Sequence, residues 1–216
     1  MKISRKDRFL AKYQHFSDLC FLSLLFLVTS LPVVTIGASV AALYTTTAKI
    51  FLHDEGTIRS TYMDAWKANL KQGTVLTCLT LAAIALAVYN IVAANRLAET
   101  GSALRIFAIA AWLFVIPLGI TMPWVFVYLS RFNDSLVRIL KNSFLLGMTN
   151  FPVTLYMLGT FVLCVALVLV LLPVFPFVLG PLFLKVVEKS EPVLIKLSQK
   201  SEGYDPDAWY NRKVDT

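Results

Sequence analysis

The sequence LCFLSLLFLVTSLPVVTIGASVAALYTTTAKIF, residues 19–51, decides the fold class of this chain. It contains no formally charged side chain before Lys49, close to its end. A helix needs about 20 apolar residues to cross the hydrocarbon core of a bilayer, so the stretch is longer than one upright span. Pro32 and Gly37 interrupt it. We therefore expect either one long, kinked helix or two shorter passes that meet near Pro32, and in both cases an integral membrane protein.

The composition of the whole chain supports this expectation. Of the 216 residues, 57% are hydrophobic and 15% are charged, whereas an ordinary soluble domain has about 25% charged residues. Further apolar runs follow at residues 73–94, 103–130 and 150–187. The first two of these runs are joined by a short turn and should form an antiparallel hairpin. We predict an all-α, polytopic helical membrane protein with four to six transmembrane segments.

Two polar connections between the apolar runs are predicted to be amphipathic helices. In the first, residues 53–72, apolar side chains such as Tyr62 and Trp66 recur at helical spacing, while lysines occupy other positions. This pattern favours a helix lying in the membrane interface. An ordinary solvated connector helix is the alternative. The second connection, residues 131–147, has the same character.

The two connections also resemble each other in sequence. After a shift of 74 positions, residues 67–73 align with residues 141–147 in a lysine, a small polar residue, an apolar residue and a glycine. Two amphipathic helices can share these residue types by chance. The alternative is a two-fold internal repeat, about residues 19–94 and 103–187, a plan found in many membrane proteins.

Charge predicts the domain organisation and the orientation. The formal net charge is +7, and residues 1–18 carry five basic and two acidic side chains. We predict a basic cytoplasmic arm at residues 1–18, a single helical membrane domain at residues 19–187 and a polar cytoplasmic tail at residues 188–216. Tyr204, Trp209 and Tyr210 could anchor that tail in the membrane interface, or it could be disordered.

The number of passes is left open between four and six. Six passes place both connections in the cytoplasm, which fits the positive-inside rule but requires short spans at residues 16–31 and 174–184. Four passes give long spans but leave the basic connections outside. Both arrangements place the N- and C-termini in the cytoplasm. Nucleic acid is not an expected partner, because the basic arm is short and tethered to a membrane.

The first third of the chain, residues 18–76, resembles the YesL family of bacterial multi-pass membrane proteins, a family of unknown function. The resemblance rests on SLPVVTIGA (residues 30–38), ALY (42–44), DEG (54–56) and AWKANLKQG (65–73). Ser23 and Phe26 stand where family members often carry Asn and Trp. The resemblance implies a bacterial plasma membrane protein of Gram-positive type, and it implies genes for sugar ABC importers and glycan-degrading enzymes as frequent neighbours.

Two functions follow as hypotheses. The resemblance implies an accessory or regulatory component of carbohydrate (ABC-type) uptake, in which an interfacial helix docks on an importer permease or its ATPase. A small transporter or channel, alone or as a homo-oligomer, is the alternative, since proline-broken helices often line transport sites; against it, no charged residue lies deep in a predicted span. The candidate partner-binding residues are Trp66, Lys67, Asn69, Lys71, Arg138 and Lys141.

A helix-break signature, Pro32, Thr35, Gly37 and Gly73, completes the candidate residues. These residues could contact a ligand, or they could only shape a kink and a close helix crossing.

An enzyme is not expected, because His15 and His53 stand alone, without an evident nucleophile or ligand set. The three cysteines lie far apart in apolar runs, which predicts neither disulfides nor a metal site. We predict no catalytic residue, no metal and no cofactor.

Overall fold

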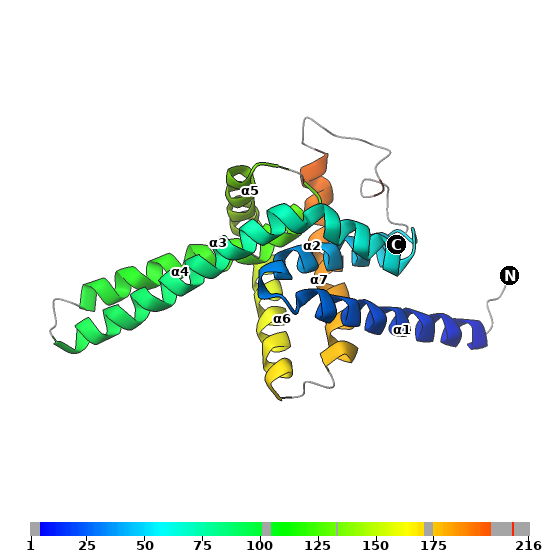
Figure 1. Ribbon diagram of the computed structural model, residues 1–216, viewed down its shortest axis with the longest axis horizontal. Helices are drawn as coiled ribbons and strands as arrows, with labels where there is room; N and C mark the ends of the chain where they lie inside the picture. The colour runs from blue at the N-terminus through cyan, green and yellow to red at the C-terminus, as the bar shows by residue number, and fades with distance from the viewer. Residues whose placement is uncertain (1–4, 101–104, 133, 171–174, 200–208, 210–216) are drawn as a thin grey trace.

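The computed structural model describes residues 5–100, 105–132, 134–170, 175–199 and 209. All regular secondary structure in these residues is helical, so the predicted all-α fold is confirmed. Figure 1 shows the order and arrangement of the helices. The elements are α1 (Arg5–Ser30), the 3-10 turn η1 (Val33–Thr35), α2 (Ile36–Thr47), the π-helix η2 (Ala48–Leu52), α3 (Ile58–Thr100), α4 (Arg105–Leu129), α5 (Leu136–Thr149), α6 (Phe151–Val170) and α7 (Phe175–Ser198).

The lengths and compositions of the helices are those of a membrane protein. Val33–Leu52 and Ile58–Arg96 are each long and apolar enough to cross a bilayer. Leu136–Thr149 and Phe151–Ala166 together form a third candidate, bent by 104°. His15–Ser30 and Val115–Leu129 are apolar but shorter within the described residues. The count of four to six passes stays a prediction.

The stretch that decides the fold class forms two helices, not one. α1 ends at Ser30, the backbone is extended at Pro32 (φ −75°, ψ 113°), and α2 begins at Ile36. The Thr35 hydroxyl is within hydrogen-bond distance of the carbonyl oxygens of Thr29 (2.7 Å) and Pro32 (2.8 Å), and the Pro32 carbonyl also accepts the Thr35 backbone N–H (2.9 Å). α2 and η2 then return along α1, because the ring of Phe51 lies 5.8 Å from that of His15.

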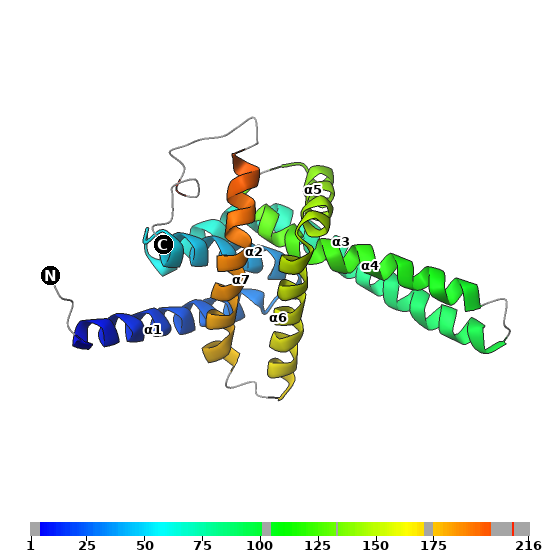
Figure 2. The same ribbon diagram turned by 180° about the vertical axis from the view of Figure 1, so that it is seen from behind.

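The first predicted connection is not a separate helix. After a turn in which Asp54 (φ 50°) and Gly56 (φ 89°) adopt left-handed backbone conformations, α3 runs for 43 residues without a break at Gly73. Its second half pairs with α4, as predicted for a hairpin, and Figures 1 and 2 show this pair extending away from α6 and α7. The change from polar to apolar sequence at residue 73 therefore marks a change of surroundings along one helix.

The second connection does end in a sharp bend. α5 stops at Asn150, which has a non-helical backbone (φ −119°, ψ 48°), and α6 leaves at 104°. The apolar run at residues 150–187 is divided between α6 and α7. Pro173 lies outside the described residues, and Pro181 lies inside α7. α7 continues to Ser198, so the first part of the predicted tail is helical.

The surroundings of Gly73 and Gly147, the glycines aligned in the possible internal repeat, agree in one respect and differ in another. Gly73 packs against Ala38 of the preceding helix α2, and Gly147 packs against Ile120 of the preceding helix α4. However, the chain continues straight after Gly73 and bends after Gly147. The internal repeat stays a prediction.

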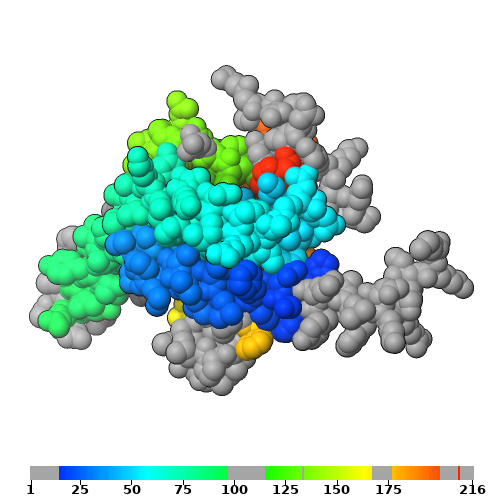
Figure 3. Space-filling view, turned by 45° about the vertical axis from the view of Figure 1, so that its right-hand side comes forward, coloured from blue at the N-terminus to red at the C-terminus, as the bar shows by residue number. Residues whose placement is uncertain are grey.

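The helices share one main core and a smaller one. Tyr44, Trp124 and Ile139 are fully buried in the main core, between α2, α4, α5 and α7. In the smaller core Leu22 of α1 and Leu43 of α2 pack around Tyr62 of α3. Figure 3 shows α1, α2 and the first half of α3 lying against one another on one face. The start of α3 is thus fixed against the N-terminal helices.

Candidate functional site

A buried cluster of polar and charged side chains joins four segments of the chain. Arg131, just after α4, forms an ion pair with Glu191 of α7, and each side chain is only 1% exposed. Tyr44 of α2 donates a hydrogen bond to the second carboxylate oxygen of Glu191 (3.0 Å), and its hydroxyl lies 2.9 Å from that of Ser190. His53, in the turn after η2, has Nε2 3.8 Å from the carboxylate. We call these five residues the charged cluster.

Trp209 of the C-terminal tail covers this cluster. Its ring is 5.5 Å from the ring of His53 in an edge-to-face arrangement, and the Arg131 guanidinium lies 5.3 Å from its centroid. Lys49 Nζ lies 6.0 Å from the same centroid. These are cation–π distances. Trp209 therefore packs on the protein, whereas Tyr204 and Tyr210 lie outside the described residues.

The electrostatics of the cluster favour an ionised carboxylate. Burial by itself would raise the pKa of Glu191, but the neighbouring His53, the Arg131 guanidinium and the Tyr44 hydroxyl outweigh it and hold the pKa below its ordinary value of 4.5. A buried pair of this kind is sensitive to loss of either partner, because the remaining charge has no water to solvate it. The cluster therefore fixes α2, the end of α4 and α7 relative to one another.

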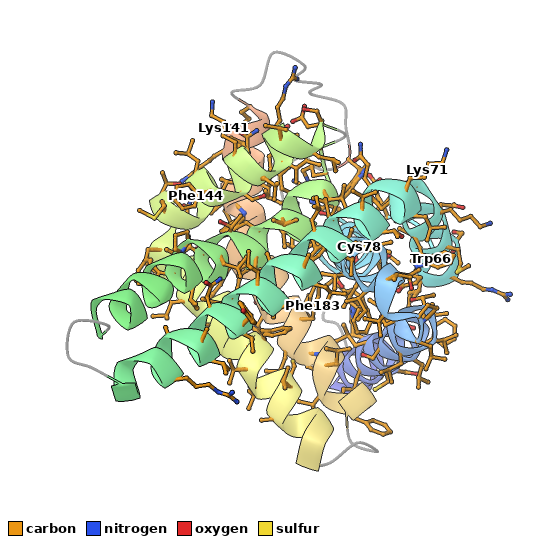
Figure 4. All side chains as sticks on the ribbon, turned by 60° about the vertical axis from the view of Figure 1, so that its left-hand side comes forward. Trp66, Lys71, Cys78, Lys141, Phe144 and Phe183 are labelled. Carbon is orange, nitrogen blue, oxygen red and sulfur yellow. The ribbon has the colours of Figure 1, made fainter. Side chains whose placement is uncertain are left out.

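Four of the predicted partner-binding residues are exposed. Lys67 and Lys71 lie on the outer side of the first half of α3, and Arg138 and Lys141 lie on α5. Figure 4 shows Lys71 and Lys141 pointing away from the body of the protein. Arg138 lies 3.4 Å from the carboxylate of Asp134, but its side chain is 74% exposed. These four cations are thus presented on two separate helices.

The other two predicted residues belong to the interior side of α3. Trp66 packs against the core formed by Leu22, Leu43 and Tyr62, and its indole N–H is buried without a hydrogen-bond partner in the described residues. Asn69 donates its side-chain N–H to the carbonyl of Ala65 in the same helix (2.8 Å). The apolar side of the first connection is thus occupied by α1 and α2, which fits the solvated alternative better than an interfacial helix.

The exposed side of the first half of α3 is polar. Ser60, Asp64, Lys67 and Lys71 recur every three or four residues, and all four are exposed. Lys67 and Lys71 make no ion pair with any side chain in the described ranges. We call these four residues the α3 polar stripe.

Gly37 and Gly73 lie where α2 and α3 cross, whereas Pro32 and Thr35 lie at the break between α1 and α2. A Cβ added to Gly37 would meet Phe126 at 2.3 Å and Thr77 at 2.4 Å, and one added to Gly73 would meet the backbone of Ala38 at 2.7 Å. The Gly37 N–H donates to the Thr77 hydroxyl (3.0 Å), which in turn donates to the Gly73 carbonyl (2.7 Å). Both glycines thus have a packing role, as small residues do at helix crossings in membranes.

Sequence reasoning did not find the charged cluster. Arg131 is 60 positions from Glu191, and Tyr44 is 147 positions from it, so no spacing pattern connects them. In the sequence His53 stands alone, and Glu191 lies in the predicted tail. The one available signal was Tyr44, a polar-tipped side chain in an otherwise apolar run, which requires a partner when buried. Within the residues described, no group of three or more His, Cys, Asp or Glu side chains could hold a metal ion.

The comparisons with known proteins cover the first part of the chain. Residues 19–91 match a family described as "Protein of unknown function, DUF624". No curated protein matches the chain, and no solved structure matches it. The matched region extends from α1 through most of α3 and includes Tyr44, His53 and the α3 polar stripe. Over about a third of its length, the chain is therefore similar to a family without a known function.

Proposed function

We propose that this chain is a non-catalytic accessory or regulatory membrane protein associated with carbohydrate uptake, and that the α3 polar stripe docks on a sugar-importer permease or its ATPase. The observation that carries the proposal is the exposure of Lys67 and Lys71, without acidic partners in the described part of the chain, on a stretch of α3 whose other side packs against α1 and α2. The resemblance to the YesL family, which includes residues 65–73, supports the choice of partner.

The stripe is held in a fixed position, which favours specific docking. Besides the crossing at Gly73, the Tyr62 hydroxyl lies 2.6 Å from that of Thr29 in α1. The Gln72 side chain donates to the Asp134 carbonyl between α4 and α5 (3.3 Å). A surface that is ordered before binding loses less entropy when a partner binds.

We place the end of the molecule that carries the charged cluster in the cytoplasm of a bacterial plasma membrane. Contacts gather several segments at this end: His15 with Phe51, and Trp209 with His53. These segments adjoin the basic arm, the first connection and the tail, and the positive-inside rule assigns such basic segments to the cytoplasm. Both termini are then cytoplasmic.

A transporter is the second candidate function. The observation that favours it is the buried carboxylate of Glu191 beside His53, because buried ionisable pairs in membrane proteins often take part in ion or proton pathways. Arg131 and His53 lie just beyond the ends of α4 and η2, however, whereas coupled transport usually places such groups near the middle of the bilayer. A proton or sugar flux in proteoliposomes that Glu191→Gln abolishes is the result expected of a transporter.

The test of the accessory function is a pull-down of the tagged chain from native membranes in mild detergent, followed by mass spectrometry. We expect a permease or ATPase at stoichiometric levels, and its loss in the Lys67→Glu/Lys71→Glu variant. Arg138→Glu/Lys141→Glu makes the same change of charge on α5 and should retain the partner. Repeated recovery of the wild-type chain alone, or only as a homo-oligomer, contradicts the proposal.

A further inference from the structure

The exposed side of α5 carries a row of large apolar side chains, unlike that of the first half of α3. Its large exposed side chains begin with Val137, which is 76% exposed, and end with Met148, which is 53% exposed. The two connections, which look equivalent in sequence, therefore present different surfaces. We call this surface the α5 apolar stripe; it consists of Val137, Leu140, Phe144, Leu145 and Met148.

Packing within the chain does not explain the stripe. The opposite side of α5 is the one that packs on the core, through Ile139, Ser143, Leu146 and Gly147. There the approach is tight, because a Cβ on Gly147 would lie 2.5 Å from the Ile120 carbonyl oxygen. α5 thus has an inner side that packs against α4 and a second, apolar side that no other described residue covers. Contiguous exposed apolar surface of this kind marks contact with a membrane or a partner.

The direction of α5 relative to α6 indicates a membrane. The bend between the two helices is 104°, close to a right angle. Phe151 and Leu155, in the first turns of α6, are exposed and carry the apolar surface onwards. When α6 enters the bilayer, α5 then lies near the membrane plane at the level where the chain enters it.

The cations beside the α5 apolar stripe favour binding to anionic lipid. Arg138 and Lys141 are exposed on α5, and Figure 4 shows Lys141 on the same helix as Phe144. A second copy of the chain docked through this surface would bring these cations near their own counterparts, which is unfavourable. Phosphate headgroups of an anionic bilayer neutralise them, with a gain of about fivefold in affinity for each cation.

We infer that α5 is an in-plane membrane anchor, with its apolar stripe at the boundary between headgroups and acyl chains and with Arg138 and Lys141 bound to anionic lipid headgroups. This inference concerns a surface separate from the α3 polar stripe. It therefore does not depend on the docking function proposed above.

The position of the stripe can be measured by spin labelling in lipid nanodiscs. Cys20, Cys78 and Cys164 are first replaced by Ala, and a label is then attached at Met148→Cys or, as a control, at Lys71→Cys. We expect the label at 148 to collide more with oxygen, and the label at 71 more with a water-soluble nickel chelate. Equal access of the chelate to both labels overturns the inference, and so does shielding of the label at 148 from both reagents, which indicates a protein partner.

The lipid preference needs a second measurement. Phosphatidylglycerol and phosphatidylcholine that stay bound after detergent extraction are compared by native mass spectrometry. For Arg138→Gln/Lys141→Gln we expect a loss of phosphatidylglycerol binding of about fivefold or more, and for Lys67→Gln/Lys71→Gln less than about twofold. Equal loss in both variants, or no loss in the first, contradicts a lipid site on α5. The pull-down of an importer has no bearing on this result.

Discussion

Replacing Arg131 by methionine should destabilise the protein more than any exposed charge change. The substitution removes the cation but leaves the Glu191 carboxylate, which is 1% exposed, in place. Tyr44 can still donate to that carboxylate, and His53 still lies 3.8 Å away, so part of the stabilisation is retained. The stack of the guanidinium on Trp209 is lost as well.

The magnitude follows from the burial of the pair. Removing one partner of a buried ion pair typically costs about 3 to 5 kcal/mol, because the remaining charge is left without compensation. For a chain of this size such a loss lowers the Tm by roughly 6 to 20 °C. Arg131→Met combined with Glu191→Met removes both charges, and that double variant should lie within about 1 kcal/mol of the wild type or above it.

The assay is thermal unfolding in one detergent, followed by circular dichroism, for the wild type, both single variants and the double variant. The exposed pair Lys185 and Glu188, with a separation of 2.6 Å, provides the matched control. Its disruption by Lys185→Met should cost less than about 1 kcal/mol. A double variant of the cluster that loses the sum of the two single losses would refute the reasoning, since independent effects mean no coupling between the charges.

Three further predictions use the same unfolding assay. Gly73→Ala should destabilise the protein by about 1 to 3 kcal/mol, because the added methyl group meets the backbone of Ala38. Gly119→Ala is the control and should be neutral or stabilising, because a methyl group there meets nothing within 4 Å. Equal effects of the two substitutions contradict the close crossing of α2 and α3. Thr35→Val should cost about 1 kcal/mol, since its hydroxyl no longer caps the break at Pro32, and an unchanged Tm argues against that role. The pKa of Glu191 in the folded protein lies below 4.5, so the contribution of its carboxylate to the free energy of unfolding is complete above that pH and is lost as the pH falls through the folded pKa. Unfolding curves at a series of pH values should show this loss in the wild type and not in Glu191→Gln.

The sequence was sufficient for the features that depend on local chemistry. The run at residues 19–51, uncharged up to Lys49, predicts membrane helices, and Pro32 predicts a break, because proline lacks the N–H that a continuing helix needs. The short turn between the two middle apolar runs likewise predicts the hairpin of α3 and α4. Each of these inferences uses neighbours in the chain.

The continuity of α3 could not be predicted from the change in polarity at residue 73. A glycine inside a helix costs only about 1 kcal/mol, which the crossing with α2 offsets. The inner side of α3 is apolar both before and after residue 73, where its side chains Tyr62 and Leu76 are fully buried. Only the outer surroundings change along the helix, and a change of solvent does not end a helix.

The difference between α3 and α5 also depends on tertiary packing. On a helical wheel both connections show apolar residues on one side and cations elsewhere, so the sequence predicts the same role for both. The apolar side of α3 is taken up by Leu22 and Leu43, whereas α5 packs through Ile139 and leaves Phe144 outside. Residues distant in sequence decide what packs against the apolar side of each helix, as they also form the charged cluster.

The most direct test of the proposed docking function is site-specific photo-crosslinking in native membranes. A photoreactive amino acid is placed at position 71, on the α3 polar stripe, and in a separate variant at position 148, on the α5 apolar stripe. We predict that position 71 forms an adduct with a permease or ATPase polypeptide and that position 148 forms adducts only with lipid. A lipid adduct alone at position 71, or the importer polypeptide at position 148 alone, would contradict the account.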